Sequence, residues 1–283
     1  MQLSHTSRAV SAVFDEPNLV SAAGLVPVLA LAEAAGLARL AQQQLSVPTD
    51  KGANAGLKVA SLVAGMVGGA DSIDDMRLLR HGGMGRVFTG RYAPSTLGSF
   101  LRSFTFGHVR QLDAVAARFL AGLAVRAPLL GDGLGEGLVL VDVDDTIVEV
   151  HGYAKQGASF GYTRVRGLNT LLATASTAES APVVVAQRLR RGSCGSPRGA
   201  KRLVADAVKT VTRLTPGLRP MLLRADSAFY GKDTITTAIR AGVEVSVTVK
   251  QTAPVKAAIA AIPADAWIPI EYSDAVLDEP TGR

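Results

Sequence analysis

The stretch LVLVDVDDTIVEV, at Leu138–Val150, decides the fold of this chain. Its valine-rich apolar run predicts a strand, in which successive side chains point to opposite faces. Asp142 and Asp144 therefore share one face, and Asp145 lies on the other. A second apolar run that ends in an aspartate, PMLLRADSAFYG, occupies Pro220–Gly231. Two strands that each bring a carboxylate to the same edge of a sheet predict a site for Mg²⁺ or Mn²⁺, because hard cations prefer oxygen ligands.

Asp226 ends the second run, where a predicted strand reaches its carboxyl end and α/β sheets gather their functional groups. Divalent ions held by carboxylates are what nucleases use to cleave phosphodiesters. Each segment alone has a simpler interpretation. The first could be a strand that emerges into solvent, and Asp226 could only cap a helix.

Composition narrows the classes of protein. The chain has 283 residues, a net charge of +6 and 22 arginines among its 30 basic residues. A pI of about 9.7 favours a polyanionic partner. One cysteine, Cys194, excludes a disulfide framework and a cysteine-based zinc site within one chain. The sequence shows no signal peptide, and its apolar stretches are too short or too interrupted by charges to span a bilayer. It therefore predicts a cytoplasmic protein with no membrane partner.

Two domains are predicted: a helical region at 1–130 and a sheet domain at 131–283. Helices are expected at Val20–Gln44 (bent or split by Pro27 and Gly36), Ala55–Met66, 71–82 and from Pro94 onward. Strands are expected at Gly137–Val150, Phe160–Thr163, Gly167–Ser176, Pro182–Gln187, Pro220–Ala225 and Val243–Val249, with helices at Pro197–Leu214 and Lys232–Ala241. The whole predicts an α+β or α/β protein whose second domain is a ribonuclease-H-like mixed sheet with helices on its faces.

One rival interpretation rests on the same first strand. DVDDTIV fits the signature of haloacid-dehalogenase-like phosphatases, an apolar strand followed by Asp-x-Asp-x-Thr. Such enzymes also need a downstream acidic pair, typically Gly-Asp-x-x-x-Asp. RADSAFYGKD does not have that spacing, so a phosphatase is the least favoured interpretation of this chain.

The residues between the two aspartates carry a resemblance. HGYAKQGASFGYTRVRGLNTLLATAST, APVVVAQRLRRGSCGSPRGAKRLVADAV and LLRADSAFYG resemble the DDE transposases of bacterial insertion sequences, nearest to the insertion sequence thirteen-eighty group. GADSIDDMRLLRHGG and APSTLGSFLRSFTFGHVRQLD are similar to the helical preamble of that group, so the resemblance covers nearly the whole chain. It implies that the helical region at 1–130 is a DNA-binding and assembly region.

The resemblance implies a ribonuclease-H-like core with two divalent metals, Mg²⁺ or Mn²⁺, held by Asp, Asp and Glu. The first family aspartate corresponds to Asp144, with Asp142 as the alternative, and the second corresponds to Asp226 in DSAFY. Nothing in this chain matches the family glutamate, and the acids of the tail (Glu271, Asp274, Asp278 and Glu279) are interpreted as solvated charges. The sheet domain is therefore expected to be incomplete at its C-terminus.

Basic residues gather between Arg188 and Arg213. Arg and Lys neutralise phosphates without regard to base sequence, so this cluster predicts contact with double-stranded DNA. An ordinary basic helix face is the alternative. The DNA-binding residues expected are Arg188, Arg190, Arg191, Arg198, Lys201 and Arg202, of which the first ones are placed in a loop.

The function expected from these observations is metal-dependent cleavage and transfer of DNA strands at the ends of an insertion sequence. The partners would be the terminal repeats of the element and the target DNA, in the nucleoid. A non-catalytic DNA-binding remnant of a transposase is the alternative from another class. Because the third carboxylate is missing, this chain alone is expected to bind DNA and not to cleave it. The sequence leaves open whether copies form a homo-oligomer.

Overall fold

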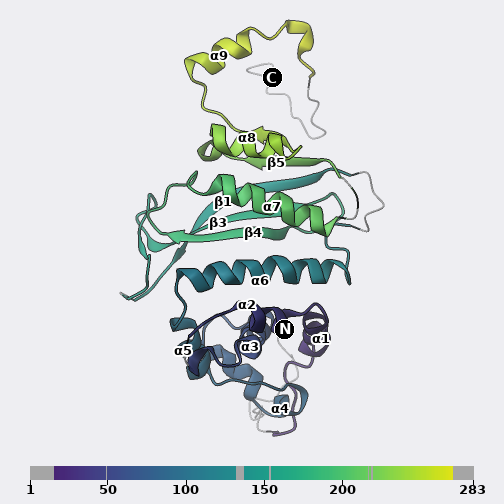
Figure 1. The fold of residues 1–283 in the computed structure, drawn as a ribbon, viewed down its shortest axis with the longest axis vertical. Coiled ribbons are helices and arrows are strands. Elements are labelled where there is room, and N and C mark those ends of the chain that lie inside the picture. Colours follow the sequence, from purple (N-terminus) through teal and green to yellow (C-terminus); the bar gives the residue numbers. More distant parts are fainter. Residues whose placement is uncertain are drawn as a thin grey trace, which may run out of the picture.

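The computed structural model describes residues 16–48, 50–131, 137–152, 154–215, 217 and 219–269. A helical region lies at one end of the molecule and a sheet at the other (Figure 1). The long helix α6 (Phe106–Ala124) runs along the sheet between the two. It packs on both sides, because Val115 belongs to the helical core while Leu120 contacts the core of the sheet.

The helical region packs its short helices around an apolar core. Leu97, Met84 and Phe100 are its most enclosed large side chains, with exposed fractions of 0%, 0% and 1%. Besides α6, its elements are α1 (Leu25–Ala34), α2 (Leu37–Gln44), η1 (Asp50–Gly52), α3 (Ala55–Val67), η2 (Asp74–Arg80), α4 (Met84–Val87) and α5 (Pro94–Arg102).

Local breaks divide the helices differently from the prediction. The expected split at Gly36 is confirmed, and this residue has a φ of 88°, which favours glycine. Pro27 does not bend the chain, because it lies in the first turn of α1, where its missing N–H costs nothing. The helix expected at 71–82 is a 3-10 helix, η2. The single helix expected from Pro94 is wrong: Thr105 and His108 form a capping box that starts α6 anew.

The sheet has the strand order β4-β3-β1-β5-β6, and the short β2 pairs with the start of β3. Strand β1 runs antiparallel to β3 and parallel to β5. This is the ribonuclease-H-like arrangement that the sequence predicts: antiparallel strands first, then two helix-connected strands parallel to β1. The elements are β1 (Val139–Glu149), β2 (Ser159–Phe160), β3 (Arg166–Ser176), β4 (Val183–Arg191), α7 (Ala200–Leu214), β5 (Met221–Ala225), η3 (Ser227–Phe229), α8 (Lys232–Arg240) and β6 (Glu244–Val247).

The two faces of the sheet differ in their cover. One face packs against α7 and α8, and Figure 1 shows α7 crossing in front of the strands. Val141 and Leu223, on that face, are fully buried. On the opposite face, Val148 and Val184 stay 51% and 49% exposed in the part of the chain that is described. The open face therefore presents its side chains to solvent.

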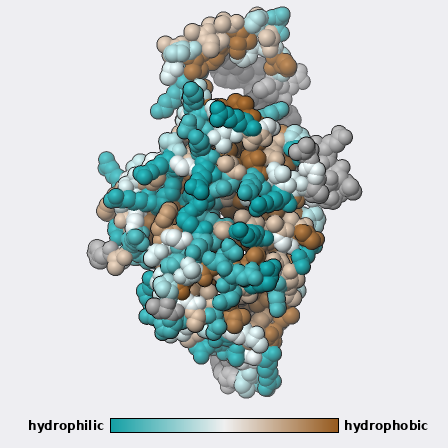
Figure 2. All heavy atoms as spheres, in the orientation of Figure 1, coloured by the Kyte–Doolittle hydropathy of each residue, from teal (hydrophilic) through white to brown (hydrophobic). Residues whose placement is uncertain are grey.

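Two features of the sheet domain differ from the prediction. Strand β4 continues to Arg191, so Arg188, Arg190 and Arg191 lie in a strand and not in a loop. Helix α9 (Ala253–Ala260) and the turn η4 (Ala264–Ala266) were not predicted; they stand apart from the sheet and present apolar surface (Figures 1 and 2).

No single helix among the described residues is long and apolar enough to cross a membrane, although the bent pair α1 and α2 passes by length and composition.

Candidate functional site

An ion pair on the open face of the sheet shows which side chains of β1 and β5 lie next to each other. Arg224 on β5 lies opposite Asp142 on β1 in the parallel register, and its Nε and Nη2 donate to the two carboxylate oxygens at 2.7 and 2.8 Å. This bidentate pair raises the pKa of Arg224, mainly through the hydrogen bond to Asp142. It also shows that both side chains lie on the same face.

Asp144 and Asp226 follow this pair by two residues each. Side chains alternate along a strand, so Asp144 lies on the face of Asp142. The backbone of Asp226 is still extended, with φ −78° and ψ 178°, which places its side chain on the face of Arg224. The structure thus brings Asp144 and Asp226 to the same face of neighbouring strands, just beyond the last paired residues, Val143 and Ala225.

Each of these carboxylates uses one oxygen locally. Asp144 Oδ1 accepts from the backbone N–H of Asp145 at 2.7 Å, and Asp226 Oδ1 accepts from that of Ala228 at 2.9 Å. Asp226 therefore does cap the turn η3, as the simpler interpretation held. Both residues are nevertheless exposed, and among the described residues the second oxygen of each carboxylate has no hydrogen-bond partner.

The turn after β5 is held by an apolar anchor. Phe229 has an exposed fraction of 0% and belongs to the core under α7. Its burial fixes the backbone that immediately follows Asp226. The sequence DSAF therefore combines a carboxylate on the open face with an aromatic ring in the core.

These two carboxylates fit a divalent cation. They are exposed, hard oxygen donors that share a face, and neither is paired with a basic side chain of the residues that the structure describes. No group of three or more His, Cys, Asp and Glu side chains suited to a metal occurs in the part of the chain that the structure describes. The tail acids Glu271, Asp274, Asp278 and Glu279 lie outside the described residues.

Asp145, on the other face, belongs to a partly buried polar network that sequence analysis missed. Its Oδ2 accepts from Asn169 Nδ2 on β3 and from Arg190 Nη2 on β4, the latter at 3.1 Å. The side chains of Asp145 and Arg190 are only 6% and 9% exposed. Burial lowers the pKa of Arg190 from its ordinary value, although Asp145 acts in the opposite direction.

Arg188 forms a second network two residues earlier on the same strand. Its guanidinium contacts Asp206 on α7 and Asp113 on α6, the latter at 3.4 Å. Burial raises the pKa of the Asp113 carboxyl against the opposing charges of Arg110 and Arg188. Arg188 and Arg190 thus form ion pairs within the protein. The expectation that they lie in a loop is wrong, because both belong to β4. DNA binding by these two arginines stays a prediction.

The other basic residues of the cluster are exposed. Strand β4 runs parallel to β1 and β5, so the loop after Arg191 lies at the end of the sheet where β5 delivers Asp226. Hydrophilic side chains gather over α7 in Figure 2. Arg191 ends β4 and Arg198 lies in the loop that follows, and both are exposed. The exposed cations of α7 are Lys201 and Arg202 in its first turn, with Lys209 and Arg213 further along.

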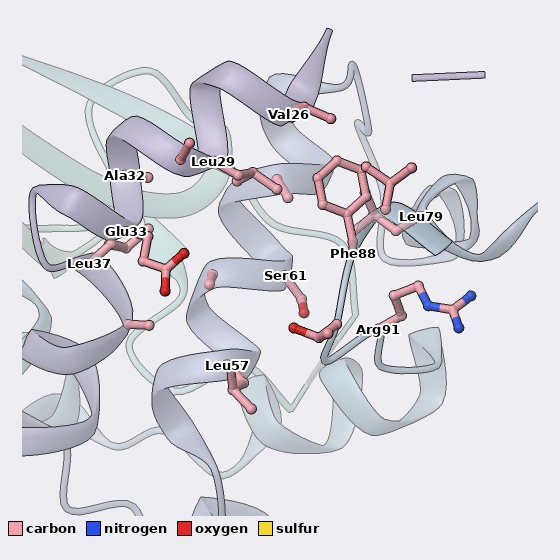
Figure 3. A pocket seen from close by; sticks show the side chains of 16 residues that line it. Val26, Leu29, Ala32, Glu33, Leu37, Leu57, Ser61, Leu79, Phe88 and Arg91 are labelled. Atoms are coloured by element: carbon pink, nitrogen blue, oxygen red, sulfur yellow. The ribbon is translucent and has the colours of Figure 1, made fainter. Parts of the chain in front are cut away.

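A cavity of about 340 Å³ lies in the helical region, away from the aspartates. Its lining is mostly apolar, and Figure 3 shows Leu29, Leu79 and Phe88 near one another, with Glu33 and Arg91 as its charged members. No carboxylate of the sheet lines it, so it is separate from the candidate metal site.

Comparison with known proteins assigns the chain to a family. The sequence model of a family described as "Transposase DDE domain group 1" matches residues 3–276. No curated protein sequence matches the chain. Among solved structures, it is similar to the "Crystal structure of the Mos1 Strand Transfer Complex", with 12% identity, a TM-score of 0.25, and coverage of 70% of this chain and 58% of that one. The chain thus spans less than two thirds of that structure's chain. The family match extends over nearly all of the sequence, and the chain belongs to the DDE-domain transposases of group 1.

Proposed function

We propose that this protein takes part in the transposition of an insertion sequence, through metal-dependent cleavage and transfer of DNA strands. The observation that carries the proposal is the placement of Asp144 and Asp226. They are exposed on one face of two neighbouring parallel strands, and each has an oxygen that no described residue occupies. Membership of the DDE transposases favours this chemistry over the phosphatase alternative.

Asp144 is the better choice for the first carboxylate than Asp142. Both oxygens of Asp142 are occupied by Arg224, so a cation would have to displace a bidentate guanidinium. Asp144 has no basic partner among the described residues that a cation would have to displace. Asp142 would instead hold Arg224 beside the site, where the cation and the guanidinium together attract a phosphate group.

The residues of the site would bind the metal ions and orient the DNA, and they need not form a covalent bond with the substrate. Asp144 and Asp226 would bind Mg²⁺ or Mn²⁺, in a two-metal site once a third carboxylate is supplied. When bound, the ions would activate the attacking oxygen and stabilise the leaving oxygen of a phosphodiester. The exposed cations after β4 would bind double-stranded DNA, both the element ends and the target, through its phosphates. The insertion sequence thirteen-eighty group remains the proposed subgroup of this chain. Because the substrate would be chromosomal DNA, we propose that the protein acts in the cytoplasm at the nucleoid.

A non-catalytic DNA-binding role is the second candidate. It is favoured by one observation: the described residues bring no third carboxylate to Asp144 and Asp226. The two candidates share DNA binding and differ in strand cleavage.

The proposed metal site predicts which aspartates bind Mn²⁺. We expect Asp144→Asn and Asp226→Asn each to weaken Mn²⁺ binding by at least tenfold, because each removes one of two charged oxygen ligands. Electron paramagnetic resonance of free Mn²⁺ during a titration measures this affinity. Asp233→Asn is the control, since that exposed aspartate lies on α8. Unchanged affinity in both site variants would overturn the assignment.

Cleavage of a supercoiled plasmid separates the two candidate functions. The proposed function predicts nicking of the plasmid that depends on Mg²⁺ or Mn²⁺ and disappears in Asp226→Asn. Binding of the plasmid without nicking, in the presence of either metal, would contradict the proposed function and would favour the non-catalytic DNA-binding role.

A further inference from the structure

Arg190 uses its guanidinium to join three strands and a loop. Its Nε donates to Asn169 Oδ1 at 2.8 Å, and its Nη2 donates to the same oxygen and to Asp145. Its Nη1 donates to the carbonyl oxygens of Ser196, at 3.0 Å, and Arg198, in the loop before α7. The side chain is therefore fixed from several directions.

The network continues from Arg190 to the open face. Asn169 Nδ2 and Arg190 Nη2 both donate to Oδ2 of Asp145, which fixes this side chain on the covered face. The backbone N–H of Asp145 then donates to Oδ1 of Asp144. Parallel pairing of β1 with β5 has ended at Val143, so β5 no longer fixes the backbone of Asp145. Its position depends on its pairing with β3 and on the side-chain network.

We propose that Arg190 is a positioning residue for the metal-binding carboxylate of Asp144. It acts through the side chain of Asp145, whose backbone N–H orients Oδ1 of Asp144. This inference rests on the proposed function, because it assumes that Asp144 binds the metal. Partners that orient metal ligands in this indirect way typically contribute tenfold to a hundredfold to metal affinity.

Arg188 provides the comparison that separates positioning from stability. It lies two residues from Arg190 on β4, is 12% exposed at its side chain and also pairs with two aspartates, one largely buried and one exposed. Its partners, Asp113 and Asp206, lie on helices and not on β1. Loss of the planar guanidinium of Arg188 should therefore destabilise the fold without disturbing Asp144.

The test compares Arg190→Lys with Arg188→Lys in the full chain. Lysine keeps the charge and loses the planar fork, so both variants should lose stability in guanidinium denaturation. We expect Arg190→Lys to weaken Mn²⁺ binding by about tenfold or more, and Arg188→Lys to bind as the wild type does. Equal Mn²⁺ affinity in the two variants would overturn the proposal.

A neutral variant covers the case in which Arg190→Lys does not fold. Asn169→Ala removes the amide that bridges Arg190 and Asp145 without changing any charge, and it should also weaken Mn²⁺ binding. Thr210→Ala is its control, because Thr210 is similarly buried but donates within α7. Wild-type affinity in Asn169→Ala would also contradict the inference. Failure of the wild type itself to bind Mn²⁺ would instead refute the proposed function.

Discussion

Replacing Phe229 with alanine is expected to lower the free energy of unfolding by about 3–5 kcal/mol, the usual cost of deleting a buried phenylalanine ring. The ring is fully buried in the core beneath α7. The cavity would also loosen the turn η3, whose backbone N–H at Ala228 holds Asp226. We therefore expect Mn²⁺ affinity to fall in the fraction of protein that remains folded. Guanidinium denaturation and Mn²⁺ titration measure the two effects.

Phe160→Ala is the matched control for this variant. Phe160 is 65% exposed on the short strand β2. Its truncation should change the free energy of unfolding by no more than about 0.5 kcal/mol, as exposed substitutions usually do. Equal losses of stability in the two variants would mean that Phe229 is not the anchor of this turn.

Removing four exposed cations is expected to weaken binding to any DNA duplex by about two to three orders of magnitude near 0.1 M salt. The substitutions are Arg191→Gln, Arg198→Gln, Lys201→Gln and Arg202→Gln. If each residue contacts one phosphate, the slope of log affinity against log salt becomes shallower by about 3.6, because each contact contributes about 0.9. Fluorescence anisotropy of a labelled duplex across a salt series gives both quantities.

The control must remove the same charge from elsewhere. Lys209→Gln, Arg213→Gln, Arg240→Gln and Lys256→Gln change four exposed cations that lie outside the segment from Arg191 to Arg202. This variant should lose less affinity and keep most of the salt dependence. Equal losses in the two variants would mean that the four cations from Arg191 to Arg202 belong to an ordinary solvated surface.

The sheet could be predicted because its signals are local. The apolar run before Asp144 and the one before Asp226 each define a strand within a dozen residues, and the helices between strands carry their own periodicity. Alternation along β1 also separated Asp145 from Asp142 and Asp144 correctly. The break between α5 and α6 was missed because a capping box with histidine at its third position is an unusual signal.

The pairing of the basic residues could not be predicted because their partners are distant in sequence. Arg188 contacts Asp113, 75 residues away, and Arg190 contacts Asp145, 45 residues away. Composition therefore did not reveal that these arginines, which are expected to contact DNA, form ion pairs within the protein. The choice between Asp142 and Asp144 has the same origin, because the guanidinium that occupies Asp142 comes from Arg224, 82 residues further along.

If Asp144 and Asp226 hold a divalent cation on the open face of the sheet, crystals soaked in Mn²⁺ should show the ion in an anomalous difference map. We expect a peak within roughly 2.0–2.6 Å of a carboxylate oxygen of both residues, with the Asp142–Arg224 pair intact. A peak on Asp142 or Asp145, or no peak at Asp226 in crystals that bind Mn²⁺ elsewhere, would contradict this assignment.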